Sequence, residues 1–154
     1  MRGSLICLLT ALCLLWASSA QAGTGRVVKV LPHFLDLQGR HTIYPSLYER
    51  DAYQAVLRQH PEKRSGIRFE VEWRTKGAIW EPLTLRLELR GTAEGNLPKE
   101  LVLEKQVKPG GWFGDWTGFP VVGEQYKAIG EVTAWRVTLW EGEQLLDEQR
   151  SFLW

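Results

Sequence analysis

Two segments near the middle of the chain alternate strictly between apolar and polar side chains. In residues 67–74, isoleucine, phenylalanine, valine and tryptophan alternate with arginine and glutamate, and in residues 83–90 four leucines alternate with polar residues. A period of two puts the apolar side chains on one face of a β-strand and the charged ones on the other. The pattern therefore predicts strands of an antiparallel sheet with one face in the core and one in water.

These two strands can be arranged in two ways. As neighbours in one sheet, with Phe69 opposite Leu87, they set Glu70 opposite Arg86. Opposite charges facing each other across a strand pair contribute a few tenths of a kcal/mol up to about 1 kcal/mol. In a sandwich the same segments instead lie in facing sheets, with their apolar sides against each other. The sequence leaves both arrangements open.

Five further segments have strand character, with turn residues between them. They are residues 26–31, 101–107, 117–122, 131–140 and 145–153. Neither face of residues 131–140 is fully polar, which predicts a central strand. Glu141-Gly142 separates this segment from the last one and predicts a hairpin.

One helix is expected near residues 46–60. Ser46 has the character of an N-cap, and Glu49 stands three residues later, which is the capping-box spacing. The helix should end at His60-Pro61, because a residue before proline is disfavoured in helical conformation. We expect this helix to pack on the sandwich between the first strand and the strand at 67–74.

The side chains of this helix divide into two stripes. The apolar stripe consists of Tyr48, Ala52 and Val56, with Tyr53 and Leu57 beside it. The polar stripe consists of Arg50, Gln54 and Arg58, spaced four apart. An amphipathic helix normally turns its apolar stripe to the core. We therefore expect the polar stripe to be solvated, with a docking face for a partner as the alternative.

The first 22 residues have the features of a secretory signal peptide. Arg2 precedes an apolar run over residues 5–16, and Ala20-Gln21-Ala22 forms an A-x-A cleavage site. The run is shorter than the roughly 20 residues that a membrane-spanning helix needs. We expect an exported protein, periplasmic or secreted, with one mature domain at 23–154 and no membrane span after cleavage. An uncleaved anchor is the alternative.

Cysteine content and charge narrow the class of protein further. Cys7 and Cys13 both lie in the predicted signal peptide, so the mature protein has no disulfide and no cysteine-ligated zinc. Lack of disulfides favours a bacterial source, because small secreted domains of eukaryotes are often rich in them. The 19 Lys and Arg residues balance 18 Asp and Glu, which argues against a nucleic-acid partner.

The mature chain resembles an immunoglobulin-like or fibronectin-type-III-like β-sandwich of about seven strands with one inserted α-helix. The resemblance covers residues 26–154, and the last two strands, around Glu141-Gly142, are similar to the closing hairpin of that fold. The paired cysteines of antibody domains are absent, so the resemblance concerns the fold alone. It implies no particular activity.

Aromatic residues in a glycine-rich loop are the first candidate site. Trp112, Phe113 and Trp116 lie within residues 110–118, which contain four glycines. Exposed tryptophans can stack on sugar rings or form a protein-binding hot spot. Alternatively, Trp112 and Trp116 plug the open end of the sandwich. Trp73 and Trp135, on apolar strand faces, are expected in the core.

The second candidate site is His33, Asp36 and His41. Two imidazoles and a carboxylate suit zinc or another first-row metal. Their spacing matches no standard motif, and His60 is the one other histidine of the chain. The alternative is a pair of solvated or hydrogen-bonded loop histidines, with no metal.

No pair of carboxylates, nucleophile motif or phosphate-binding loop stands out, so we expect no enzyme and no cofactor. The sequence favours a noncatalytic exported domain that binds or scaffolds another protein. The alternative is a small carbohydrate-binding module that uses the loop tryptophans. A third hypothesis is a metal protein or enzyme built around His33, Asp36 and His41.

Overall fold

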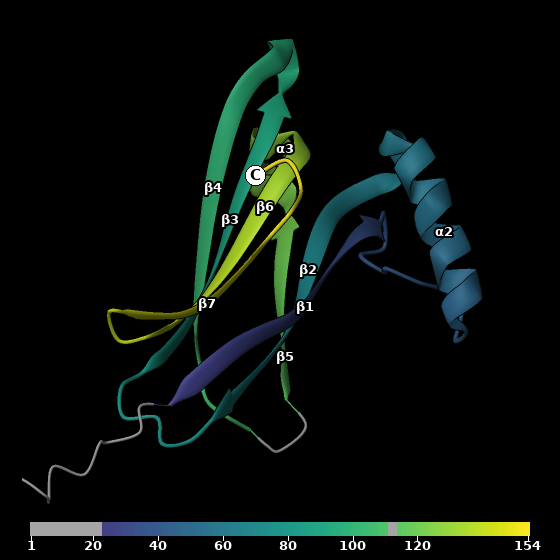
Figure 1. Cartoon of the computed structure of the whole chain (residues 1–154). Helices are drawn as coiled ribbons and strands as arrows, with labels where there is room; N and C mark the ends of the chain where they lie inside the picture. The colour runs from purple at the N-terminus through teal and green to yellow at the C-terminus, as the bar shows by residue number, and fades with distance from the viewer. Residues whose placement is uncertain (1–22, 111–113) are drawn as a thin grey trace, which may run out of the picture.

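The structure is a computed structural model that describes residues 23–110 and 114–154. The predicted signal peptide, residues 1–22, lies outside the described residues, as do Trp112 and Phe113. Within the described part, seven strands form two antiparallel sheets that pack face to face (Figure 1). The predicted mostly-β antiparallel sandwich with a helix inserted after the first strand is confirmed.

One sheet has three strands in the order β1-β2-β5, and the other has four in the order β4-β3-β6-β7. The strands are β1 (Thr24–Asp36), β2 (Arg64–Lys76), β3 (Leu83–Ala93), β4 (Leu97–Val107), β5 (Asp115–Val122), β6 (Glu131–Glu141) and β7 (Gln144–Arg150). The helices are α2 (Leu47–Gln59) and α3 (Gly123–Ile129), with short 3-10 turns at η1 (Pro61–Lys63) and η2 (Glu94–Asn96). Neither α-helix in the described ranges has the length and apolar character needed to cross a bilayer.

The strands at 67–74 and 83–90 lie in different sheets, so the neighbour pairing of Phe69 with Leu87 is wrong. Phe69 is paired with Pro32 of β1 on one side and with Phe119 of β5 on the other. Leu87 instead pairs with strands β4 and β6. In the facing arrangement the apolar sides of the two strands pack against each other. Charge matching between neighbouring strands could not show that this arrangement is the one adopted.

The core lies between the two sheets and is built from the alternating apolar positions. β2 contributes Phe69, Val71 and Trp73, and β3 contributes Leu83, Leu85, Leu87 and Leu89, all of them at most 2% exposed. Trp73 also donates a hydrogen bond from Nε1 to the hydroxyl of Thr117, at 2.9 Å. Trp135 is only partly buried and packs against the edge of this core.

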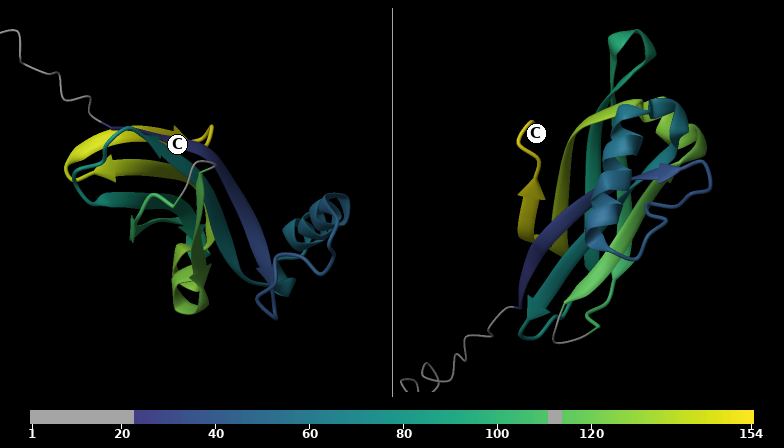
Figure 2. Two further views of the ribbon diagram at one scale, coloured as in Figure 1. Left: turned by 90° about the horizontal axis from the view of Figure 1, so that it is seen from below. Right: turned by 90° about the vertical axis from the view of Figure 1, so that its right-hand side faces the viewer.

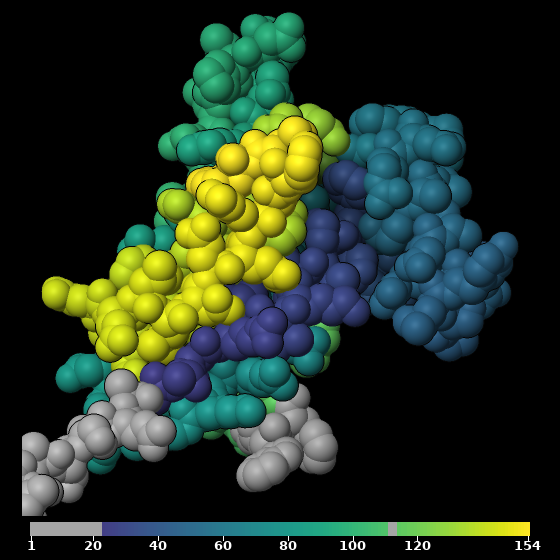
Figure 3. Space-filling model, viewed as in Figure 1, coloured from purple at the N-terminus to yellow at the C-terminus, as the bar shows by residue number. Residues whose placement is uncertain are grey.

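The predicted closing hairpin is present as β6 and β7, which pair across Glu141 and Gln144. β6 lies between β3 and β7, as expected for a central strand. β7 also approaches β1 across the edge of the sandwich, where the Val27 amide donates to Asp147 Oδ2 at 2.8 Å (Figure 3).

The short helix α3 connects β5 to β6 and is absent from the elements that the sequence predicts. It spans seven residues and has no side-chain N-cap, so its sequence carries little helical signal. It ends at Gly130, whose φ is +68°. A Cβ at Gly130 would collide with the carbonyl oxygen of Thr92, so the approach of α3 to β3 requires glycine there.

Helix α2 stands beside the ends of β1 and β2, away from the four-stranded sheet (Figures 1 and 2). The Ser46 hydroxyl accepts from the Glu49 amide at 3.2 Å and donates to the Glu49 carboxylate at 2.6 Å. The predicted N-cap at Ser46 is therefore confirmed. In the space-filling view α2 forms a separate lobe at the side of the molecule (Figure 3).

Candidate functional site

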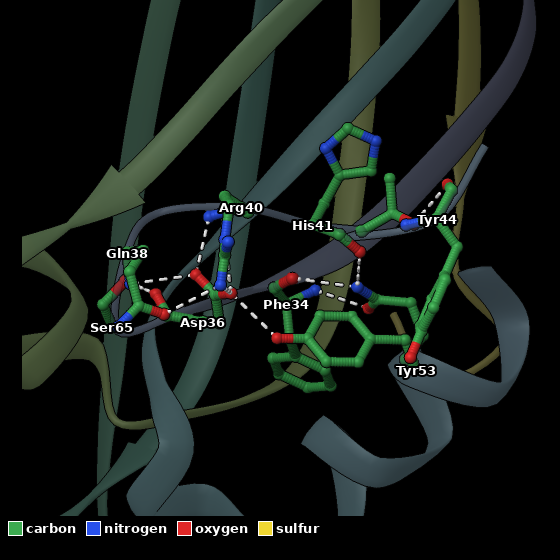
Figure 4. Close-up of polar contacts among 10 residues, drawn as sticks. Phe34, Asp36, Gln38, Arg40, His41, Tyr44, Tyr53 and Ser65 are labelled. Carbon is green, nitrogen blue, oxygen red and sulfur yellow. Dashed lines mark hydrogen bonds and ion pairs between the residues drawn. The ribbon is translucent and has the colours of Figure 1, made fainter. Parts of the chain in front are cut away.

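The ring of His33 stacks on that of His41 at the junction between β1 and α2. Figure 4 shows Asp36 and His41 at this junction. His33 lies in β1, Asp36 is the last residue of that strand, and His41 belongs to the segment that leads to the helix. Strand β1 turns sharply after Asp36, because the Gly39 amide donates to the Asp36 carbonyl at 2.8 Å. The turn returns the chain alongside the strand it has just left.

The Asp36 carboxylate is fully engaged in this turn. It accepts from the backbone amides of Gln38 and Arg40 and from the Arg40 guanidinium, each at 2.9 Å, and from the Tyr53 hydroxyl at 2.8 Å. Burial alone would raise the pKa of Asp36, but the hydrogen bonds from Arg40 and Tyr53 hold that pKa below its ordinary value. Asp36 is therefore a structural anion that ties α2 to the end of β1.

The two histidine rings stack on each other. Their centroids are 5.3 Å apart and their planes differ by 29°. Stacked rings aim their nitrogen lone pairs nearly in parallel, whereas metal ligands must converge on one point. Within residues 23–110 and 114–154, no three His, Cys, Asp or Glu residues gather in a way that could hold a metal ion. The arrangement gives the metal hypothesis no supporting geometry.

His33 is buried, and its Nδ1 atom has no hydrogen-bond partner among the residues that the structure describes. Burial lowers the pKa of His33 to about 4, and the neighbouring His41, Arg50 and Arg68 act in the same direction, against Asp51. His33 is therefore neutral near pH 7. Its protonation would place an unpaired charge at the base of α2.

Gln54 is the residue that fixes α2 to the strand. Its side-chain amide donates to the carbonyls of Phe34 and His41, at 2.9 and 2.7 Å, and its oxygen accepts from the Phe34 amide at 2.8 Å. The amide group thus pairs with the outer edge of β1 as another peptide would. The expectation that the stripe of Arg50, Gln54 and Arg58 is solvated is wrong at its centre, because Gln54 is buried.

The apolar stripe of α2 points away from the protein, which corrects the expectation that it packs on the sandwich. Tyr48 is 85% exposed, Leu47 68% and Val56 42%, and Ala52 is exposed as well. Leu57 is the apolar residue of the helix that is buried. The right-hand view of Figure 2 looks directly onto α2, with the strands behind it. We call Tyr48, Ala52 and Val56 the α2 outer face.

Replacing Gln54 with leucine should loosen α2 without emptying its site. The change leaves the Phe34 amide and the Phe34 and His41 carbonyls unpaired, and we expect a loss of about 1–3 kcal/mol in unfolding free energy. Hydrogen exchange at the Phe34 amide should accelerate. Gln59→Leu, at the exposed end of the same helix, is the matched control. Equal stability of the two variants would contradict the bridging role of Gln54.

The exposed aromatic Trp116 lies on another part of the molecule. It stands on the outer face of the three-stranded sheet, opposite Glu72 of β2, and is 53% exposed. It therefore does not plug the sandwich. The other two members of the predicted aromatic site, Trp112 and Phe113, lie outside the described residues.

Comparison of the chain with protein-family models, curated proteins and solved structures gives no match. Function must therefore be inferred from two surfaces of the molecule, the α2 outer face and the face that carries Trp116.

Proposed function

We propose that this protein is a noncatalytic exported β-sandwich that binds another protein through the α2 outer face. The observation that carries the proposal is the outward orientation of the apolar stripe. A helix with an apolar stripe gains stability by covering it. Here the sandwich contacts the opposite side of α2 through Tyr53, Gln54 and Leu57, so the stripe is left for a partner.

The geometry of α2 suits a partner that offers an apolar groove. Tyr48, Ala52 and Val56 follow one another every four residues, the spacing by which helices anchor in such grooves. Charged residues Glu49, Asp51 and Arg58 flank the stripe and supply a polar rim. The Ser46 cap and the Gln54 hydrogen bonds hold the helix in place beforehand, which reduces the entropy lost on binding.

The titratable groups at the base of α2 support a noncatalytic role. The Asp36 carboxylate oxygens accept hydrogen bonds from Arg40, Tyr53 and the backbone amides of the turn, and His33 is buried. Asp36 holds the binding helix on the strand through the Tyr53 hydroxyl, and this structural role supports the proposal.

We also propose export with removal of residues 1–22 and a sandwich of the immunoglobulin-like or fibronectin-type-III-like kind. The strand order supports the second point: β3, β6 and β7 lie together in the four-stranded sheet, β1, β2 and β5 form the other sheet, and the closing hairpin joins β6 to β7. In constant-type immunoglobulin domains the fourth strand extends the sheet of strands A, B and E. Here β4 instead pairs with β3.

If residues 1–22 are removed on export, N-terminal sequencing of the exported protein should give Gly23 as its first residue.

Placing two glutamates on the α2 outer face should abolish partner binding and leave the fold intact. For Tyr48→Glu with Val56→Glu, we expect at least about a tenfold loss of affinity, because each charge must be buried unpaired in the partner's groove. Unfolding free energy should change by no more than about 0.5 kcal/mol per substitution. A partner is first captured from an extract of the source cells with immobilised residues 23–154 and then purified. Its dissociation constants for the unaltered protein and for the variant are compared by calorimetric titration.

The matched control carries the same type of change on exposed apolar residues elsewhere, Leu97→Glu with Val102→Glu on β4. These side chains are 57% and 53% exposed. If the control weakens binding as much as the α2 variant does, or if neither weakens it, the α2 outer face is not the binding surface.

A second candidate function is carbohydrate binding by Trp116. The observation that favours it is the exposure of this indole on an open sheet face, where the ring of a sugar could stack.

A further inference from the structure

The outer face of the three-stranded sheet gathers positive charge at the start of β1. Arg26 lies directly opposite Arg74 of β2, and Thr24 lies opposite Lys76. Like charges directly opposite each other in an antiparallel pair destabilise the sheet. The two strands thus carry three cations at two successive residue pairs of the solvent-facing side.

On the solvent-facing side of the four-stranded sheet, arginines form ion pairs with glutamates of neighbouring strands. Arg86 pairs with Glu104 of the neighbouring strand, and Arg136 pairs with Glu88, each at 2.6 Å. Among the residues that the structure describes, Arg26, Arg74 and Lys76 take part in no such ion pair. These three exposed cations are therefore open to an anion from outside the chain.

These cations surround a hollow of about 310 Å³. Its lining consists of Thr24, Gly25, Arg26, Arg74, Lys76 and Asp147. Asp147 is the one carboxylate in that lining, and its Oδ2 already accepts from the Val27 amide at 2.8 Å. The hollow therefore has a positive excess, hydrogen-bond donors on both strands, and room for an anionic group with part of the molecule that bears it.

Trp116 stands on the same face, diagonal to Arg74 of the neighbouring strand, with the carboxylate-bearing Glu72 directly opposite it. Arg74 follows Glu72 on the same side of β2. Diagonal neighbours on one sheet face are about 7–8 Å apart, within reach of aromatic and long side chains. A β-bulge near Val28 places the next cation of β1, Lys29, opposite Glu72 as well. The indole and the hollow can thus contact two parts of one ligand.

We propose that this face binds an acidic saccharide. A sugar ring stacks on the indole of Trp116, and a carboxylate of the same chain is held in the hollow by Arg26, Arg74 and Lys76. The guanidinium groups suit a carboxylate because they can donate two parallel hydrogen bonds to it. The proposal rests on the second candidate function and adds the requirement for a negative charge. It is independent of the α2 outer face.

The test compares two sugars that differ only in that charge. The mature protein, residues 23–154, is titrated with a hexamer of β-1,4-linked mannuronate and with β-1,4-linked mannohexaose. We expect the acidic hexamer to bind about tenfold more tightly at about 50 mM salt, and this preference to shrink at about 500 mM salt. Arg74→Gln should abolish the preference, and Trp116→Ala should weaken both sugars.

Arg150→Gln, the same change on an exposed arginine of β7, is the matched control and should keep the preference. Arg74→Gln should melt no lower than the unaltered protein, because the substitution removes a like-charge pair. A lower melting temperature would instead mark Arg74 as a structural residue and overturn the proposal.

The outcomes separate this inference from the function on which it rests. Equal binding of both sugars, lost in Trp116→Ala, would overturn the acidic site and keep the carbohydrate-binding candidate. Binding of neither sugar would overturn both. Binding of a single-stranded oligonucleotide in place of the mannuronate hexamer would also overturn the saccharide proposal.

Discussion

Trp73→Ala should lower the free energy of unfolding by about 3–5 kcal/mol, the usual cost of truncating a large aromatic side chain in a packed core. Trp73 is 1% exposed and lies in the same cluster as Leu85 and Leu87 of the facing sheet. The substitution leaves a cavity between the two sheets and also deprives the Thr117 hydroxyl of its indole donor. Urea unfolding followed by circular dichroism measures the loss.

Trp80→Ala is the matched control for this change. Trp80 is 77% exposed, and its contact with Glu141 is made by its backbone amide, which alanine keeps. We expect its stability to stay within about 0.5 kcal/mol of the unaltered protein. A Trp73→Ala loss no larger than that of Trp80→Ala would contradict the burial of Trp73 in the core.

The second large effect is a loss of stability on mild acidification, caused by His33. Its pKa is about 4 in the folded protein and near 6.5 when unfolded, so the unfolded chain takes up a proton first as the pH falls. The folded state is therefore favoured fully above about pH 6.5 and loses up to about 3 kcal/mol as the pH falls to 4. Asp36, whose pKa is lowered, adds its own loss only below about pH 4.

Urea titrations at several pH values between about 4 and 7 test this dependence. His33→Phe keeps a ring for stacking on His41 and removes the titration, so its stability should vary less with pH than that of the unaltered protein. His60→Phe, at a half-exposed histidine beside Glu62, is the matched control and should keep the dependence on His33. The prediction fails if His33→Phe retains the same slope.

Strand positions and their facing sides were predictable from the alternation alone. Every segment proposed as a strand lies in or overlaps an observed strand, and the Ser46 cap starts the helix as expected. These features are local, because a period of two or a capping box is complete within a few residues. The partner of each strand was not predictable. β2 and β3 have equivalent alternating patterns, and their charged side chains can be accommodated whether the two strands are neighbours in one sheet or lie in facing sheets.

The orientation of α2 was the main point on which the sequence misled. Its apolar stripe has the spacing of a core-facing helix, and Gln54 belongs to the stripe that should face water. The structure exposes the apolar stripe and buries Gln54, because the outer edge of β1 presents backbone groups at Phe34 that an amide side chain can bind. No residue near Gln54 reveals that such an edge will lie beside it.

The sequence by itself determined where the strands lie, which side of each is apolar and where the long helix begins. It also determined which residues have the chemistry to bind a metal, a sugar or a protein. The tertiary structure alone decided that β2 and β3 face each other, that the apolar stripe of α2 is open, and that Arg26 stands opposite Arg74. The physical reason is that side-chain periodicity sets the direction of each residue within its own element. The neighbour that it meets there depends on long-range pairing, which only the folded chain establishes.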